Sequence, residues 1–114
     1  MVLLALWREG DYSPRMITID ESRVGHIFRD ALGHFTDDTE LSRQAMIDIA
    51  NDPTNILGTD HFGNMWAAKT LPDGTQIWVQ IRDGGITNGG INRIPRHFNL
   101  MTPSSVPTGS GCAQ

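Results

Sequence analysis

Three side chains in this sequence have the chemistry that a site for proton transfer at a phosphate needs. His26 and His34 lie eight residues apart, each directly after a glycine, and Arg82 ends an alternating strand pattern. Histidine exchanges protons near neutral pH, and a guanidinium binds a phosphate through two hydrogen bonds. Metal-free cleavage of RNA needs a base for the 2′-hydroxyl, an acid for the leaving 5′-oxygen and a cation at the phosphate. These three residues therefore form the candidate catalytic set.

Four further residues are candidates for substrate binding, and each has an ordinary alternative. Lys69 is either a phosphate contact or an edge lysine that blocks the addition of another strand. Thr87 can hydrogen-bond a base or a phosphate, although a common turn dipeptide follows it closely. Arg96 and His97 either complete the site or lie on a solvated edge of the sheet.

The candidate catalytic residues have structural explanations as well. His26 is equally consistent with a surface position on a helix, and His34 with a residue that closes the end of that helix. Arg82 has the alternative of an exposed arginine at a strand end. Trp66 and Trp78 can stack on bases, but tryptophan more often fills a core, and we expect that for at least one of them.

Two helices are expected before the sheet. Apolar residues recur at helical spacing after Thr18 or Asp20, either of which can cap a first helix that ends at Gly33. A second helix is predicted to start at Asp37, where a capping-box pattern begins, and to stop at residues 51–53.

The period then changes from helical to alternating, which predicts strands separated by glycine-containing turns. The expected strands are residues 64–71, 75–82, 86–88 and 91–98, with turns at 72–74 and 83–85 and a bend at Gly89-Gly90. The order of elements predicts an α+β fold, with N-terminal helices packed on one face of a small antiparallel β-meander. We expect one domain at residues 18–100, between a lead-in segment at 1–17 and a disordered tail at 101–114.

The distribution of charge is more informative than its sum. The chain of 114 residues is long enough for one domain, and its formal net charge of −4 by itself argues against a nucleic-acid binder. Residues 64–100 hold four basic side chains against two acidic ones, whereas the remainder holds five against eleven. The basic side chains are thus concentrated on the predicted sheet, which is consistent with one anion-binding face.

Other classes of site are not indicated. The single cysteine, Cys112, permits neither an internal disulfide nor a thiolate zinc site. Asp60 and His61 do not complete any familiar spacing of metal ligands, so we expect no metal and no cofactor. The apolar run at residues 1–7 is far too short to cross a bilayer, and we expect no membrane partner.

With these residues in view, the chain resembles the C-terminal toxin domains of bacterial polymorphic and contact-dependent inhibition systems. The resemblance covers about Arg23 to Asn99 and is carried by the segments GHIFRDALGHFTDD, LGTDHFGNMW, LPDGTQIWVQIRDG and ITNGGINRIPRHFN. Such domains look like the superfamily that groups barnase, the EndoU nucleases, a colicin ribonuclease and RelE. The resemblance implies a metal-independent ribonuclease, often acting on transfer RNA and neutralised by a cognate immunity protein. It also implies delivery as part of a larger bacterial toxin into the cytoplasm of a target cell.

Two other functions stay open on the sequence. The domain could be a non-catalytic module whose sheet edge or tryptophan-bearing face binds a protein. It could also be a delivered toxin with another chemistry, such as an NAD-directed activity, although no glycine-rich dinucleotide motif is present. A deaminase is disfavoured, because the sequence lacks the paired cysteines that would bind its zinc.

Overall fold

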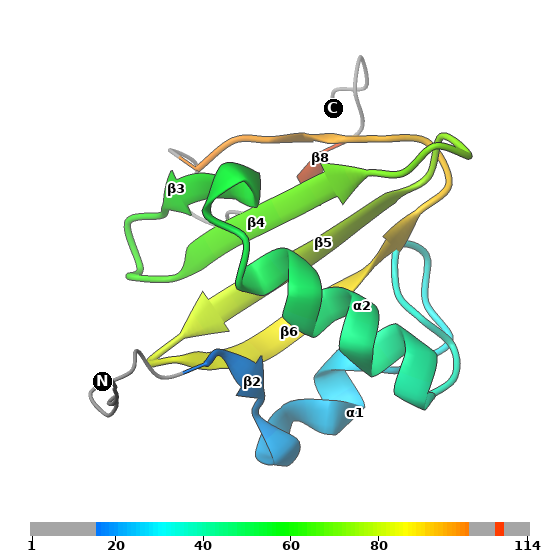
Figure 1. Ribbon diagram of the computed structural model, residues 1–114, viewed down its shortest axis with the longest axis horizontal. Coiled ribbons are helices and arrows are strands. Elements are labelled where there is room, and N and C mark those ends of the chain that lie inside the picture. Colours follow the sequence, from blue (N-terminus) through cyan, green and yellow to red (C-terminus); the bar gives the residue numbers. More distant parts are fainter. Residues whose placement is uncertain (1–15, 101–106, 109–114) are drawn as a thin grey trace, which may run out of the picture.

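The computed structural model describes residues 16–100 and 107–108. A five-stranded mixed sheet lies at its centre with helices packed against it (Figure 1), which confirms the predicted α+β class. The strands lie side by side in the order β2-β6-β5-β4-β3. Their bounds are Thr18–Ile19 for β2, Ile56–Thr59 for β3, Met65–Thr70 for β4, Gln76–Arg82 for β5 and Gly85–Asn92 for β6.

The predicted strands at 64–71 and 75–82 are β4 and β5, and the one at 86–88 lies within β6, whereas β3 was not predicted. β3, β4, β5 and β6 pair in sequence order, each antiparallel to the next. Asp83 and Gly84 join β5 to β6 with φ angles of 53° and 81°, as the favoured two-residue hairpin turn requires. β2 departs from the prediction, because Thr18 begins a short strand parallel to β6 instead of capping a helix.

The first helix is much shorter than expected. The segment forms a 3-10 turn, η2 (Glu21–Arg23), and one helical turn, α1 (Val24–Ile27), so the predicted end at Gly33 is wrong. After α1 the chain pairs with itself, because the backbone N–H of Arg29 donates to the carbonyl of Phe35 at 2.9 Å. The residues between them form a loop that lies over the sheet, where the carbonyl of Gly33 accepts a hydrogen bond from Trp78.

The second helix, α2 (Glu40–Ala50), begins later than the predicted start at Asp37. Thr39 is its N-cap, with Oγ1 accepting from the backbone N–H of Ser42 at 3.0 Å. Asp38 is occupied elsewhere, since Arg43 donates to its two carboxylate oxygens at 2.6 and 2.7 Å. This ion pair holds the loop before α2 against the first turns of the helix.

The core lies between α2 and the sheet face toward the viewer in Figure 1. The alternation of β5 turns its apolar residues to this face, and α1 adds one buried isoleucine. The most buried members of the core are Ile27, Met46, Ala67, Val79 and Ile86. The remaining residues of β5, which are Gln76, Trp78, Gln80 and Arg82, lie on the opposite face.

β6 runs without interruption through Gly89 and Gly90, so the predicted bend there is wrong. A Cβ at Gly89 would lie 2.8 Å from the sulfur of Met46, and a Cβ at Gly90 would lie 1.9 Å from the carbonyl oxygen of Gly33. Because no side chain fits at these distances, the glycine pair lets α2 and the loop after α1 approach the strand from opposite faces.

The remaining elements are short. η3 (Pro53–Asn55) joins α2 to β3, and β7 (His97–Phe98) lies within the predicted strand at 91–98. β7 pairs with β8 (Pro107–Thr108), the one part of the predicted tail that falls within the described residues. The predicted lead-in lies almost wholly outside them. No helix among the described residues is long and apolar enough to cross a membrane.

Candidate functional site

The sheet face opposite α2 carries a concavity that we call the polar groove. It consists of three adjoining hollows of about 590, 210 and 300 Å³. The first and second hollows share His34, Asn92 and Arg96 in their walls, and the second and third share Gln80 and Asn88. Strands β5 and β6 form its floor, and the loop after α1 forms one wall.

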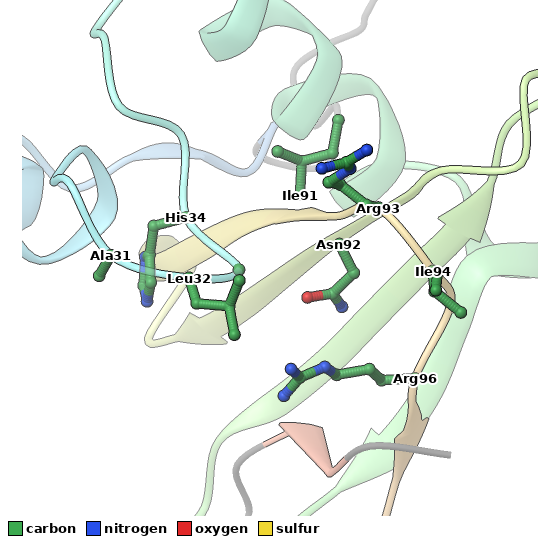
Figure 2. Close-up of a pocket in the computed structure, with 9 residues that line it drawn as sticks. Ala31, Leu32, His34, Ile91, Asn92, Arg93, Ile94 and Arg96 are labelled. Atoms are coloured by element: carbon green, nitrogen blue, oxygen red, sulfur yellow. The ribbon is translucent and has the colours of Figure 1, made fainter. Parts of the chain in front are cut away.

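Positive charge lines the polar groove from end to end. Five arginines and two histidines contribute to its walls, and none of the described aspartates or glutamates does, although Asp20 and Asp83 line a fourth hollow that shares Arg23, Arg82 and Thr87 with the third. These basic residues are Arg23, Arg29, Arg82, Arg96, His26 and His34, together with Arg93, whose guanidinium points away from the others, beside Ile91 (Figure 2). In a chain with a net charge of −4, this segregation makes the groove the natural surface for an anion.

His26 and Arg82 lie in the same hollow, the third. His26 is exposed on α1, and none of the described side chains hydrogen-bonds its ring. Arg82 donates from Nη1 to the carbonyl of Phe62 at 2.9 Å and to Oδ1 of Asn64 at 3.2 Å. These bonds orient the guanidinium and leave its other N–H groups for a ligand.

His34 lies in the two neighbouring hollows, and both of its ring nitrogens are engaged. Nη2 of Arg29 lies 3.0 Å from Nε2, and Nδ1 lies 3.2 Å from the carbonyl oxygen of Ile27. Because a guanidinium only donates, Nε2 accepts and Nδ1 carries the proton.

The charge state of His34 follows from its surroundings. Burial lowers the pKa of His34, and the charges of Arg29 and His26 lower it further, against the opposing effect of the Ile27 carbonyl. His34 is therefore mainly neutral at pH 7. Its ring also meets the ring of Trp78 edge-on, with 5.5 Å between centroids, which fixes its orientation.

A buried carboxylate, Asp60, organises the loop that positions Arg82. Its Oδ2 accepts from Nε1 of Trp66 at 2.9 Å and from the side-chain amide of Asn64 at 3.2 Å. Its Oδ1 accepts from the backbone N–H groups of Phe62 and Asn64, both at 2.9 Å. Burial raises the pKa of Asp60, but these hydrogen bonds outweigh that effect and lower it to about 2. Asn64 is thereby fixed with its oxygen toward Arg82.

Trp66 and Trp78 form the floor of the groove. Both are buried, their rings stack with 5.7 Å between centroids, and Phe98 packs against both. Nε1 of Trp78 donates to the carbonyl of Gly33 at 3.0 Å. The expectation that at least one tryptophan fills a core is confirmed for both, and neither presents an open face to a base.

The four predicted substrate-binding residues lie in different places. Thr87 lines the third hollow and Arg96 lines the first two. Lys69 pairs with Ile77 across the strands and therefore lies on the α2 side of the sheet, away from the groove. His97 lies in β7 and lines a separate hollow that shares Arg96 with the groove.

Three residues of the groove carried no recognised signal in the sequence. Arg29 meets His34 only because the chain folds back after α1, whereas an unbroken helix to Gly33 was expected. Asn64 gains its role from Asp60, which the sequence raises only as a metal ligand and whose spacing does not support that role. Asn92 would follow from the sequence if one strand were predicted to continue through Gly89 and Gly90. The alternation of side chains in that strand places Asn92 on the same face as Asn88.

Comparisons with known proteins add no constraint on function. No group of three or more histidine, cysteine, aspartate or glutamate side chains within the described ranges is arranged to hold a metal ion. No family model, no curated protein and no solved structure matches the chain. The resemblance to bacterial toxin domains therefore stays a prediction, and the geometry of the polar groove is the basis for inferring function.

Proposed function

We propose that this chain is an endoribonuclease domain that binds RNA in the polar groove and cleaves it by metal-independent transphosphorylation. The observation that carries this proposal is the concentration of arginines and histidines along three adjoining hollows of an acidic chain, whose lining contains no carboxylate among the described residues. A groove of this kind suits single-stranded RNA, whose backbone brings a negative charge with each nucleotide. In this proposal the domain is part of a bacterial toxin, its substrate is transfer RNA, and a cognate immunity protein inhibits it.

The two histidines divide the proton transfers in this proposal. Nε2 of His34 takes the proton of the 2′-hydroxyl while the 2′-oxygen forms its bond to phosphorus. His26 gives a proton to the 5′-oxygen while the bond between phosphorus and that oxygen breaks. Arg82 binds a non-bridging phosphate oxygen where negative charge develops. The products are a 2′,3′-cyclic phosphate and a free 5′-hydroxyl.

Arg29 must leave Nε2 of His34 before this base can act. Its guanidinium is exposed, and a charged phosphate oxygen is a stronger acceptor for it than a neutral imidazole. An incoming phosphate therefore draws Arg29 away and frees the lone pair of His34. The neutral state of His34 suits this role, since a base must be unprotonated when the substrate arrives.

A non-catalytic protein-binding module is the second candidate, and two observations favour it. Arg29 occupies the nitrogen of His34 that a base would need. Leu32 and Ile94 are 86% and 76% exposed at the rim of the groove, beside its arginines. Apolar side chains next to arginine are typical of protein interfaces, and an acidic partner would complement this surface.

The test is cleavage of end-labelled RNA by the purified protein in EDTA. We expect the His26→Ala variant to lose about a hundredfold in rate, which is typical of a lost acid–base group, without a change in unfolding. His61→Ala is the matched control, because His61 is exposed and lies outside the groove. Products that end in 2′,3′-cyclic phosphate support the mechanism. Full activity in His26→Ala would reject the role of His26, and intact RNA with the parent protein would favour the second candidate.

A further inference from the structure

A pair of buried amides on the groove side of the sheet has its orientation fixed by hydrogen bonds. Gln76 and Asn92 face each other across β5 and β6 and are 7% and 4% exposed. Oε1 of Gln76 accepts from the backbone N–H of Arg96 at 2.9 Å, and its Nε2 donates to the Arg96 carbonyl at 3.1 Å. Nδ2 of Asn92 donates to the same Oε1 at 2.9 Å. Asn92 therefore turns its nitrogen toward Gln76 and its oxygen away.

The side-chain oxygen of Asn92 accepts no hydrogen bond from any N–H or O–H in the described part of the chain. It lies beside Gly33, where an added Cβ would come within 3.0 Å of it, and in Figure 2 it faces Leu32 across the first hollow. Buried carbonyl oxygens are nearly always hydrogen-bonded, so a ligand with an N–H group would gain a bond here.

The side chain of Arg96 lines the same hollow as Asn92. The backbone of Arg96 holds Gln76, and its side chain has no acceptor among the described residues. Figure 2 shows the guanidinium extended across the hollow below Asn92 and Leu32, whereas the guanidinium of Arg93 points the other way, beside Ile91. The lining of the first hollow thus includes one hydrogen-bond acceptor and one fork of donors.

The geometry points to a nucleobase subsite in the first hollow. Nucleobase edges carry an N–H donor next to a ring-nitrogen or carbonyl acceptor, and such an edge would donate to Oδ1 of Asn92 and accept from Arg96. Leu32 and Ile94 supply apolar cover for the flat faces of the ring, and the hollow of about 590 Å³ is large enough to hold one. An unprotonated phosphate has no N–H for Asn92 and would use Arg96 alone. This subsite rests on the proposed function in one respect, which is that RNA supplies the base.

The test measures base preference with RNA that cannot be cleaved. Four 2′-O-methyl pentanucleotides, which differ only in the central base, are titrated against the parent protein and followed by fluorescence anisotropy. We expect the parent to prefer one base by about tenfold, the range of a good bidentate contact. In Arg96→Gln this preference should fall below about twofold, because the loss of a base contact removes discrimination between bases. Arg93→Gln should keep the preference, because the loss of a phosphate contact weakens binding to all sequences alike.

The remaining outcomes of these titrations either overturn the subsite or separate it from ribonuclease activity. Equal binding of the four pentanucleotides by the parent, or an equal loss for all four in Arg96→Gln, would overturn the subsite. Cleavage of unmodified RNA is measured separately in the same preparation. A base preference without cleavage would support the subsite and reject the ribonuclease activity. Cleavage without a base preference would support the ribonuclease activity and reject the subsite. An absence of binding to all four would reject the subsite together with RNA binding in the groove.

Discussion

The two faces of the central sheet use the same strands in opposite ways. On the α2 face, alternate residues of β5 such as Val79 pack against Met46 and Ile86 in a wholly apolar layer. On the groove face, Gln76 and Trp78 are equally buried, but hydrogen bonds with defined partners hold them. The first face stabilises the fold by burying apolar surface, whereas the second also fixes the direction of polar side chains. The groove face therefore combines a structural role with the candidate site.

The largest expected effect comes from Gly90, the point where the groove wall meets the sheet. The Gly90→Ala variant should lose stability at the upper end of the roughly 1–3 kcal/mol that overpacking costs, since its Cβ would lie 1.9 Å from the Gly33 carbonyl oxygen. Urea unfolding measures this change. Gly25→Ala is the control, because no described heavy atom outside its chain neighbours and its own helix backbone lies within 4 Å of an added Cβ. Equal stability of the two variants would mean that the loop does not pack on β6 as described.

A smaller loss is expected from Asp60, which supports the groove face alone. The Asp60→Asn variant should lose about 2 kcal/mol, because hydrogen bonds to a charged acceptor are replaced by weaker ones. The folded pKa of Asp60 is about 2, below its ordinary value of 3.8, so its contribution is complete above about pH 4 and is lost as the pH falls toward 2. Urea unfolding at pH 7, 4 and 2 should therefore show a steeper acid loss in the parent than in Asp60→Asn. Parallel curves would contradict the assignment.

The smallest effect on stability is expected for a substitution of Arg29, which should instead change the pKa of His34. Arg29→Gln removes a positive charge beside Nε2 of His34, so the pKa of His34 should rise. The free energy of unfolding should change by less than about 1 kcal/mol, as is usual for an exposed charge. An NMR titration of the histidine ring protons measures the shift, with Arg93→Gln as the control. An unchanged or lower pKa in Arg29→Gln would show that Arg29 does not bind His34.

Much of the sheet was predictable because its signals are local. The alternation in β5 and the Pro72-Asp73-Gly74 turn depend on neighbours in sequence, and the structure has both as expected. The bend predicted at Gly89-Gly90 failed for a tertiary reason. Glycine there serves the close approach of Met46 on one face and Gly33 on the other, which no local pattern records.

The candidate site was predictable only in part, for the same reason. His26, His34 and Arg82 were chosen by residue type, and the structure sets all three along one groove. Their partners depend on contacts between distant segments, such as Arg29 on His34 and the Asp60 loop on Arg82. Lys69 was chosen by charge alone, and strand pairing turns it to the other face.

The most direct test of the account is the affinity for RNA of two variants that differ only in the face of the sheet they change. Anisotropy titrations with a single-stranded 2′-O-methyl RNA compare Arg82→Gln, on the groove face, with Lys69→Gln, on the α2 face. We expect Arg82→Gln to bind about tenfold or more weakly, because a charge-assisted hydrogen bond is lost, and Lys69→Gln to bind like the parent. An equal loss in both variants, or a loss confined to Lys69→Gln, would contradict the claim that the polar groove is the binding face.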